Sequence, residues 1–283
     1  MPRIPTPRQA PAVSLSNHQG LDWLRLWREL AEAHPPRRWQ KHKGDKGKTV
    51  QRRWVKPDAI WRFIVARLDA ASNATVLDIG AGTGAWSVLL AQHARQVTAV
   101  EMAPPMIAAM QETLADAGVT NVAVVAGAWP EVPVDVHDFS VCSHAMYGCV
   151  DFRPFIEGMV AATRRTCFLV LRVPATDGVM AEAARRVWGQ PYDSVNFQVA
   201  YNALLQMNLY PHVLMGDPGI WRRWRHDSLE AARDEIKRRL GLGPDSPHDA
   251  FLMDLLRRRL TEEDGQYVWP PDTRSALIYW DTD

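Results

Sequence analysis

The stretch VLDIGAGTGAWS, residues 76–87, constrains the fold more than any other part of the sequence. Three glycines alternate directly after a run of β-forming residues. Glycine permits backbone conformations and close approaches that other residues do not. In parallel α/β sheets a loop of this kind follows the first strand, and the N–H groups of the next helix face the ligand that it holds. We therefore predict a nucleotide-like ligand at the carboxyl end of this strand.

Short β-forming runs alternate with segments of helical length from residue 74 onward, which is the pattern of βαβ units. Such units place a parallel sheet between two layers of helices, so we predict a doubly wound α/β domain. The predicted strands cover residues 75–79, 96–100, 122–126, 139–143 and 166–173, and the predicted helices cover residues 85–93, 104–117 and 152–163.

The chain before this domain is predicted to consist of a tip and a helical cap. Residues 1–14 are rich in proline and are expected to be disordered, and residues 15–73 form the cap. The cap would hold one helix ending near Ala33, a loop at 37–56 and a second helix opening at Pro57. Four apolar residues share one face of the second helix, which should cover the edge of the sheet or the mouth of its ligand site: Ile60, Trp61, Ile64 and Leu68.

Residues 74–283 would form the α/β domain, with additions on the substrate side in 174–272 that include a helical insertion before the last strand. Further helices are predicted at 178–188, 196–207, 228–240 and 250–260, a strand-like segment at 212–225, and a last strand at 276–280.

The composition is that of an ordinary globular protein: 283 residues, 47% hydrophobic and 23% charged, enough for one large α/β domain with additions. No signal peptide and no apolar run of the ~20 residues that a membrane helix needs is evident, which favours a cytoplasmic protein without a membrane partner. The three cysteines form no CxxC pair, and the nine histidines form no metal-binding pattern, so we predict no metal site.

The segment from Arg37 to Lys56 is strongly basic, with nine lysines or arginines and one acid, Asp45. Basic residues interleaved with tryptophans could bind RNA or could close as a lid over an acidic metabolite. A solvated loop beside a tryptophan-rich helical core is the third interpretation. Of the three, the solvated loop is the interpretation that we favour, and the sequence indicates no oligomeric state.

The spacing of the glycines in this loop differs from that of two known classes of nucleotide-binding loop. Dinucleotide-binding loops follow GxGxxG, and P-loops need GxxxxGK[ST], whereas this chain has Asp78 followed by GxGxG. A carboxylate beside the loop would repel a pyrophosphate but would attract a cationic amino group. The sequence LDIGAGTG closely resembles the first motif of class I S-adenosylmethionine-dependent methyltransferases, and the resemblance extends from Val76 to about Val173.

This resemblance implies a mostly parallel, seven-stranded, Rossmann-like sheet and S-adenosylmethionine as cofactor, with S-adenosylhomocysteine as product. It also implies that the last two strands pair as an antiparallel hairpin at one edge of the sheet, and the segments IWRRWR and SALIYW could be those strands. It implies that Asp78 positions the methionyl amino group and that Glu101, after the second strand, accepts hydrogen bonds from the ribose hydroxyls. Met102 would flank the adenine. The residues expected to shape the cofactor loop are Gly80, Ala81, Gly82 and Gly84.

The chain departs from the family pattern after the third and fourth strands. Where many members carry an acid for the adenine amino group, this chain has Ala128 and Trp129, which could offer a backbone group and an aromatic wall, or could belong to the core. After the fourth strand the sequence SHAMY replaces the (N/D)PP(Y/F) signature of amide and adenine N-methyltransferases, so the resemblance favours a small-molecule acceptor.

This last segment holds the candidate catalytic residues. His144 could act as a general base near neutral pH, or could be structural or bind the cofactor's carboxylate. Tyr147 could orient a substrate or could be a core residue, and Ser143 is predicted to contact the cofactor. Cys149 lacks the cysteine pattern of thiol-based chemistry. Methyl transfer needs mainly alignment, so a base is not required.

We therefore predict an S-adenosylmethionine-dependent methyltransferase that acts on a small molecule by in-line attack on the sulfonium methyl. The alternatives are an RNA methyltransferase that uses the basic segment 37–56, and a regulatory or assembly protein that binds the cofactor without catalysis. A nicotinamide oxidoreductase fits least, given Asp78 and the glycine spacing.

Overall fold

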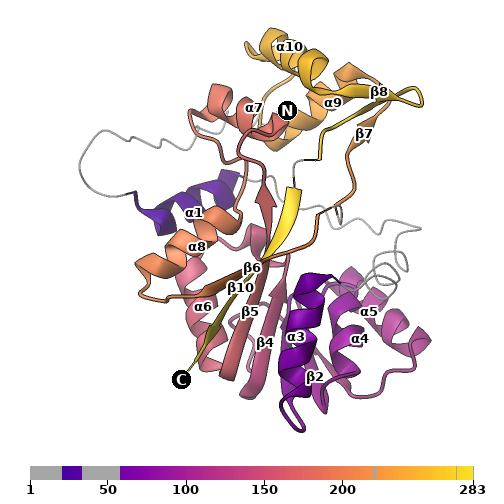
Figure 1. Cartoon of the computed structure of the whole chain (residues 1–283), viewed down its shortest axis with the longest axis vertical. Coiled ribbons are helices and arrows are strands. Elements are labelled where there is room, and N and C mark those ends of the chain that lie inside the picture. Colours follow the sequence, from indigo (N-terminus) through magenta and orange to yellow (C-terminus); the bar gives the residue numbers. More distant parts are fainter. Residues whose placement is uncertain (1–20, 34–57, 219–220, 272, 283) are drawn as a thin grey trace, which may run out of the picture. The chain divides into compact units, whose positions relative to one another are not determined.

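The structure is a computed structural model that describes residues 21–33, 58–218, 221–271 and 273–282. The predicted tip, the start of the first cap helix and the basic segment 37–56 lie outside these residues. Contacts between residues divide the chain into two compact units (Figure 1). The sheet unit comprises described residues 58–171, 204–217 and 275–282, and the accessory unit comprises the others.

The sheet unit is built on one seven-stranded sheet with the order β3-β2-β1-β4-β5-β10-β6 (Figure 1). The strands are β1 (Thr75–Ile79), β2 (Gln96–Glu101), β3 (Val122–Ala126), β4 (His137–Ser143), β5 (Thr163–Pro174), β6 (His212–Met215) and β10 (Thr273–Asp281). Strands β1 to β5 pair in parallel, and β6 pairs antiparallel with β10. The predicted doubly wound, mostly parallel fold is confirmed, with β1 and β3 at the predicted bounds.

The chain order and the sheet order together determine where the loops after β1, β2 and β4 lie. The chain runs outward from β1 through β2 to β3, then returns to pair β4 on the other side of β1. This reversal is a topological switch point, and in open α/β sheets ligands bind beside the carboxyl ends of the strands at such a point. The glycine loop after β1 therefore lies where the fold places a ligand site.

Four helices pack in the sheet unit: α3 (Ala59–Asp69), α4 (Ala85–Ala91), α5 (Pro104–Asp116) and α6 (Phe152–Ala161). Helix α3 begins at Ala59 and not at Pro57, because the side chain of Asp58 caps it by accepting a hydrogen bond from the Trp61 N–H at 2.7 Å. Loss of this hydrogen bond would leave the Trp61 N–H, in the first turn of α3, without its acceptor.

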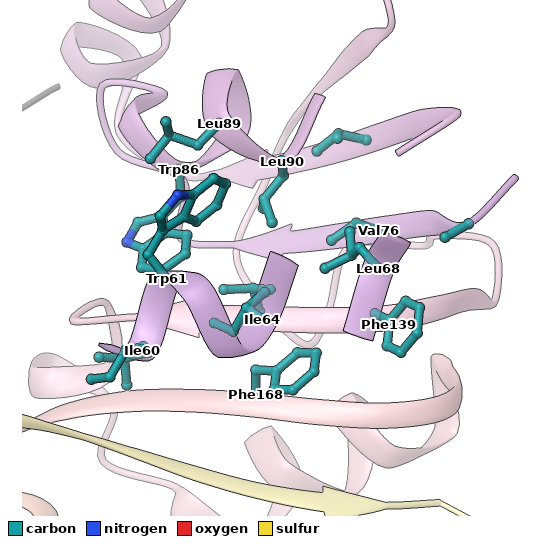
Figure 2. Packing of buried hydrophobic residues seen from close by; sticks show 14 of the residues in the cluster. Ile60, Trp61, Ile64, Leu68, Val76, Trp86, Leu89, Leu90, Phe139 and Phe168 are labelled. Atoms are coloured by element: carbon teal, nitrogen blue, oxygen red, sulfur yellow. The ribbon is translucent and has the colours of Figure 1, made fainter. Parts of the chain in front are cut away.

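The apolar face predicted for α3 forms part of the main core (Figure 2). Ile60, Trp61, Ile64 and Leu68 are all buried. Trp61 meets the edge of Trp86 from α4, with ring centroids 5.8 Å apart. Because this helix belongs to the sheet unit, the two units group residues differently from the predicted cap (15–73) and domain (74–283).

The accessory unit contains a small sheet, with strand order β7-β9-β8, and several helices. Its elements are α1 (Trp23–Ala33), α7 (Val179–Trp188), β7 (Arg225–His226), α9 (Leu229–Arg239), α10 (Asp249–Arg259), β8 (Thr261–Glu263) and β9 (Gln266–Val268), while α8 (Phe197–Gln206) spans the boundary between the units. The predicted insertion before the last strand is thus present, since α9 and α10 lie between β6 and β10.

The predicted pairing of IWRRWR with the last strand is wrong. The partner of β10 is β6, with Val213 opposite Ile278, whereas Arg225 and His226 form β7 and pair with β9. In β6 only Leu214 packs against the core, while Val213 and Met215 are exposed, so the apolar content of the segment does not explain the pairing. Among the described residues, no helix combines the length and the apolar character that a membrane crossing requires.

Candidate functional site

The loop between β1 and α4 has three glycines in the left-handed backbone region, Gly80 (φ 68°), Gly82 (φ 59°) and Gly84 (φ 81°). Side chains disfavour this region, which explains the alternation of glycine in the sequence. The N–H groups of Gly80 and Ala81 both donate to the carbonyl of Val100 on β2, at 2.9 and 3.0 Å. The loop is thereby attached to the end of the neighbouring strand.

The side chain of Glu101, the last residue of β2, holds this loop in place through hydrogen bonds. One carboxylate oxygen, Oε2, accepts the Gly82 N–H at 2.9 Å, and the other, Oε1, accepts the Ala103 N–H at 2.8 Å. The side chain is almost completely buried. The next residue, Met102, is 62% exposed, which is unusual for a large apolar side chain at a strand end.

The surroundings of the three glycines differ. A Cβ on Gly80 would lie 2.3 Å from the Cβ of Ala145, and one on Gly84 would lie 2.8 Å from Met110 Cγ. A Cβ on Gly82 would meet nothing within 4 Å. Gly80 and Gly84 are therefore required for packing, whereas Gly82 borders open space.

Asp78 lies in β1 just before the loop and is fully buried. Burial raises the pKa of its carboxyl to about 7, the hydroxyl of Ser87 counteracts this by donating to Oδ2 at 2.6 Å, and the nearby charge of Glu101 adds to the increase. A buried acid with such a pKa is stabilised in its charged form by a cation. The site therefore combines a buried acid with an open glycine, as a ligand carrying an amino group requires.

The segment after β4 holds a second set of polar groups. The Ser143 Oγ is buried without a hydrogen-bond partner among the described residues, and such orphaned groups are rare in proteins. His144 has a left-handed backbone (φ 55°), which is uncommon for a residue other than glycine. Its Nδ1 lies 2.7 Å from the Tyr147 hydroxyl, and its Nε2 lies 3.3 Å from Ser275 Oγ.

The loop after β3 holds the other two predicted cofactor residues. The carbonyl of Ala128 accepts the Val132 N–H at 3.0 Å. The indole N–H of Trp129 donates to the carbonyl of Phe155 on α6 at 3.1 Å, and its ring meets the Phe155 ring edge-on. This geometry agrees with the packing interpretation of Trp129, while its role toward adenine stays a prediction.

The thiol of Cys149 is not activated. Burial raises its pKa to about 11, far above neutral, so it is protonated at physiological pH. Among the described residues no cluster of three or more His, Cys, Asp or Glu side chains has the arrangement of a metal site.

Two residues that the sequence analysis did not single out belong to the site. Ser87 lies in the first turn of α4, nine positions after Asp78. A serine at this distance from an acid is only a weak sequence signal of a hydrogen bond between the two side chains. Ser275 comes from β10, 131 positions after His144, and no sequence pattern indicates this contact.

Fold and site together define the class of domain: an α/β cofactor-binding domain of the class I methyltransferase type. Residues 76–166 match a family model described as a methyltransferase domain. Over these residues the chain therefore resembles a methyltransferase domain in sequence, and its sheet has the Rossmann-like methyltransferase order.

Two curated relatives share short stretches with the chain. One is a protein-L-isoaspartate O-methyltransferase from a Synechococcus species, 42% identical over 77 residues, or 24% of this chain and 32% of the relative. The other, of the same name, is from Methanoculleus marisnigri, 41% identical over 82 residues, or 26% and 37%. The chain thus spans about a third of the length of these relatives.

A solved structure supports the fold over a longer range. The YcgJ protein from Bacillus subtilis has a TM-score of 0.51 and 15% identity, covering 77% of this chain and 96% of its own. At this identity the likeness concerns the fold alone.

Proposed function

We propose that this protein transfers a methyl group from S-adenosylmethionine to a small-molecule acceptor, releasing S-adenosylhomocysteine. The observation that carries the proposal is the glycine loop: Glu101 holds it to the end of β2, Gly82 faces open space, and the buried Asp78 precedes it. These residues lie in the segment that matches the methyltransferase model.

Glu101 and Asp78 are assigned complementary roles toward the cofactor. Each carboxylate oxygen of Glu101 accepts one backbone N–H and has a further lone pair, so the ribose hydroxyls can donate to it. Burial raises the pKa of Asp78 to about 7, and the methionyl ammonium would favour its ionised form. A pyrophosphate beside this acid would be repelled, which argues against a dinucleotide.

The remaining cofactor contacts are proposed from position. Met102 follows Glu101 and presents an exposed apolar side chain for the adenine. The unpartnered Ser143 Oγ at the end of β4 supplies a hydroxyl for the cofactor. Ala128 and Trp129, after β3, would border the adenine. Gly80, Ala81 and Gly84 shape the loop.

When bound, S-adenosylmethionine supplies an electrophilic methyl group on its sulfonium. The residues of this chain would bind it, align it with the acceptor and handle the acceptor's proton. His144 and Tyr147 are proposed for the last task because they form one hydrogen-bonded pair at the end of β4.

The acceptor class is inferred from the segment after β4. Its sequence, SHAMY, has no pair of prolines to hold a planar amide or adenine amino group. We therefore favour a small molecule of the cytoplasm over RNA as the methyl acceptor. An RNA acceptor would depend on the segment 37–56, outside the described residues, and a protein acceptor is suggested only by the names of the two curated relatives.

A labelled methyl group tests this function. The protein would be incubated with S-adenosylmethionine labelled in the methyl and with three separated fractions of a cell extract: small molecules, RNA and protein. Label in the small-molecule fraction supports the proposal. Label in RNA or protein moves the acceptor to that class, and cofactor binding without transfer to any fraction supports the non-catalytic alternative.

A matched pair of variants makes the assay specific. Gly82→Ala places a methyl group into the open space of the cofactor loop and should abolish transfer. Gly118→Ala introduces the same backbone strain, at φ 63° and also in open space, but at the end of α5. Transfer should therefore persist in Gly118→Ala.

A further inference from the structure

Ser275, His144 and Tyr147 form a hydrogen-bonded row that joins β10 to the segment after β4. All three residues belong to the sheet unit. The rings of His144 and Tyr147 lie nearly parallel, with an angle of 13° between them. Each ring nitrogen of His144 therefore has a hydroxyl next to it.

The two distances favour one assignment of the donors. The 2.7 Å between Tyr147 Oη and His144 Nδ1 lies at the most common length of hydrogen bonds with O–H donors and at the short end of the range for N–H donors, about 2.7–3.2 Å. A phenol is also more acidic than a serine hydroxyl. Tyr147 then donates to Nδ1, so the neutral imidazole carries its proton on Nε2 and donates it to Ser275 Oγ at 3.3 Å.

Backbone contacts fix His144 and Ser275. His144 has a left-handed φ of 55°, a conformation that is unfavourable outside glycine and is maintained by the surrounding structure. Its N–H donates to the carbonyl of Val170 on β5 at 2.9 Å. The carbonyl of Ser275 accepts the Gly216 N–H at 2.8 Å, which anchors β10 to the end of β6. The imidazole is thus held between two anchored strands.

The row lies beside the cofactor loop. Gly80 of that loop approaches Ala145 so closely that an added Cβ would be 2.3 Å from the Ala145 Cβ, and Ala145 directly follows His144. The segment that carries His144 and the largely buried Tyr147 therefore meets the cofactor loop at Ala145.

We propose that Ser275 is a positioning residue that holds His144 in the Nε2–H tautomer, so that the Tyr147–His144 pair can take up the proton which the methyl acceptor loses. This proposal rests on the proposed methyl transfer. The acceptor's X–H bond breaks, and its proton goes to Tyr147 Oη while the phenolic proton moves to His144 Nδ1. The resulting imidazolium carries two N–H groups, and Ser275 Oγ accepts the one on Nε2. The electron pair left on X would form the bond to the methyl carbon, while the bond between the methyl carbon and sulfur would break with its electron pair going to sulfur, leaving S-adenosylhomocysteine.

Nitrogen NMR of the imidazole tests the positioning role without a known acceptor. In ¹⁵N-labelled full-length protein at a pH where His144 is neutral, Nδ1 should show the shift of a bare nitrogen and Nε2 that of a protonated one. His144→Asn, which tolerates a left-handed backbone, assigns the signals by their loss. Ser275→Ala should move both nitrogens toward the average of the two tautomers, and Ser275→Thr should restore the wild-type values.

The control is Ser140→Ala, which removes another buried hydroxyl, one bonded to Thr163 and located on β4, and should leave the His144 signals unchanged. A proton on Nδ1 in the wild type would overturn the proposal, as would signals that Ser275→Ala leaves unaltered. S-adenosylhomocysteine is titrated in parallel. If S-adenosylhomocysteine fails to bind, the proposed function is wrong, and so is the proposed proton uptake. If S-adenosylhomocysteine binds while Ser275→Ala leaves the His144 signals unchanged, only the positioning role of Ser275 is wrong.

Discussion

The carboxylate of Glu101 accepts the Gly82 N–H at 2.9 Å, so the acid after β2 holds in place the middle glycine of the loop after β1. The two family motifs, which are 19 positions apart, thus form one structure before any ligand binds. A preorganised site of this kind loses less conformational entropy when its ligand arrives.

Gly82→Ala should weaken cofactor binding more than it weakens the fold. The left-handed backbone at φ 59° makes alanine unfavourable by about 1–2 kcal/mol, and the new methyl group would enter the open space above the loop. Gly118→Ala, at φ 63°, should lose a similar free energy of unfolding in urea. Only Gly82→Ala should lose affinity for S-adenosylhomocysteine, at least tenfold by calorimetry. Equal affinities of the two variants would contradict this.

Asp78 should make the stability of the protein without cofactor depend on pH. Its pKa is about 7 in the folded state and about 4 in the unfolded state, so the folded state binds the proton more tightly. The stabilisation is complete below about pH 4 and is lost as the pH rises to about 7, by up to a few kcal/mol. Asp78→Asn keeps an oxygen for Ser87 and removes this dependence.

Urea unfolding of both proteins at pH 5 and pH 8 measures the effect. The difference in unfolding free energy between the wild type and Asp78→Asn should shift in favour of the variant as the pH rises. A difference that does not change with pH would show that Asp78 is ionised across the whole range.

The same group should link cofactor binding to pH. The methionyl ammonium favours ionised Asp78, so binding should release a proton below about pH 7, and affinity should rise as the pH rises toward that value. Calorimetry in buffers of different ionisation enthalpy counts the released protons. Asp78→Asn should bind more weakly and release fewer; the same proton count in both proteins would exclude Asp78 as the source.

Gly80 and Ala145 should behave as a coupled pair. Gly80→Ala would bring two Cβ atoms within 2.3 Å, so it should destabilise the fold by about 1–3 kcal/mol or more. Ala145→Gly in the same chain removes the clash and should recover part of that loss, leaving the backbone strain at φ 68°. A double-mutant cycle by thermal unfolding measures the coupling, and purely additive effects would show that the residues do not touch.

The sequence was most informative where local pattern and tertiary position agree. The β-branched runs of β1 and β3 are bounded by turn residues, and their predicted bounds match those of the structure. The face of Ile60, Trp61, Ile64 and Leu68 on α3 was readable because its helical period reflects burial.

Other features depend on contacts that no local pattern reports. Strands β7, β8 and β9 have only two or three residues, too few for an alternation of apolar side chains. The β8–β9 hairpin does have a local signal, because Asp264-Gly265, both with left-handed backbones, is a pair typical of tight hairpin turns. The choice of β6 over IWRRWR as the partner of β10, and of Ser275 as the partner of His144, is made by tertiary packing.

Calorimetric titration with S-adenosylhomocysteine, with NADH as the comparison ligand, tests the central claim most directly. The wild type should bind S-adenosylhomocysteine with micromolar affinity and should not bind NADH. Glu101→Gln, which puts an amide NH₂ against one of the two backbone N–H groups, should lose most of this affinity, while Asp116→Asn at the exposed end of α5 should keep it. Folded protein that does not bind S-adenosylhomocysteine, or that prefers NADH, would contradict the assignment of this site.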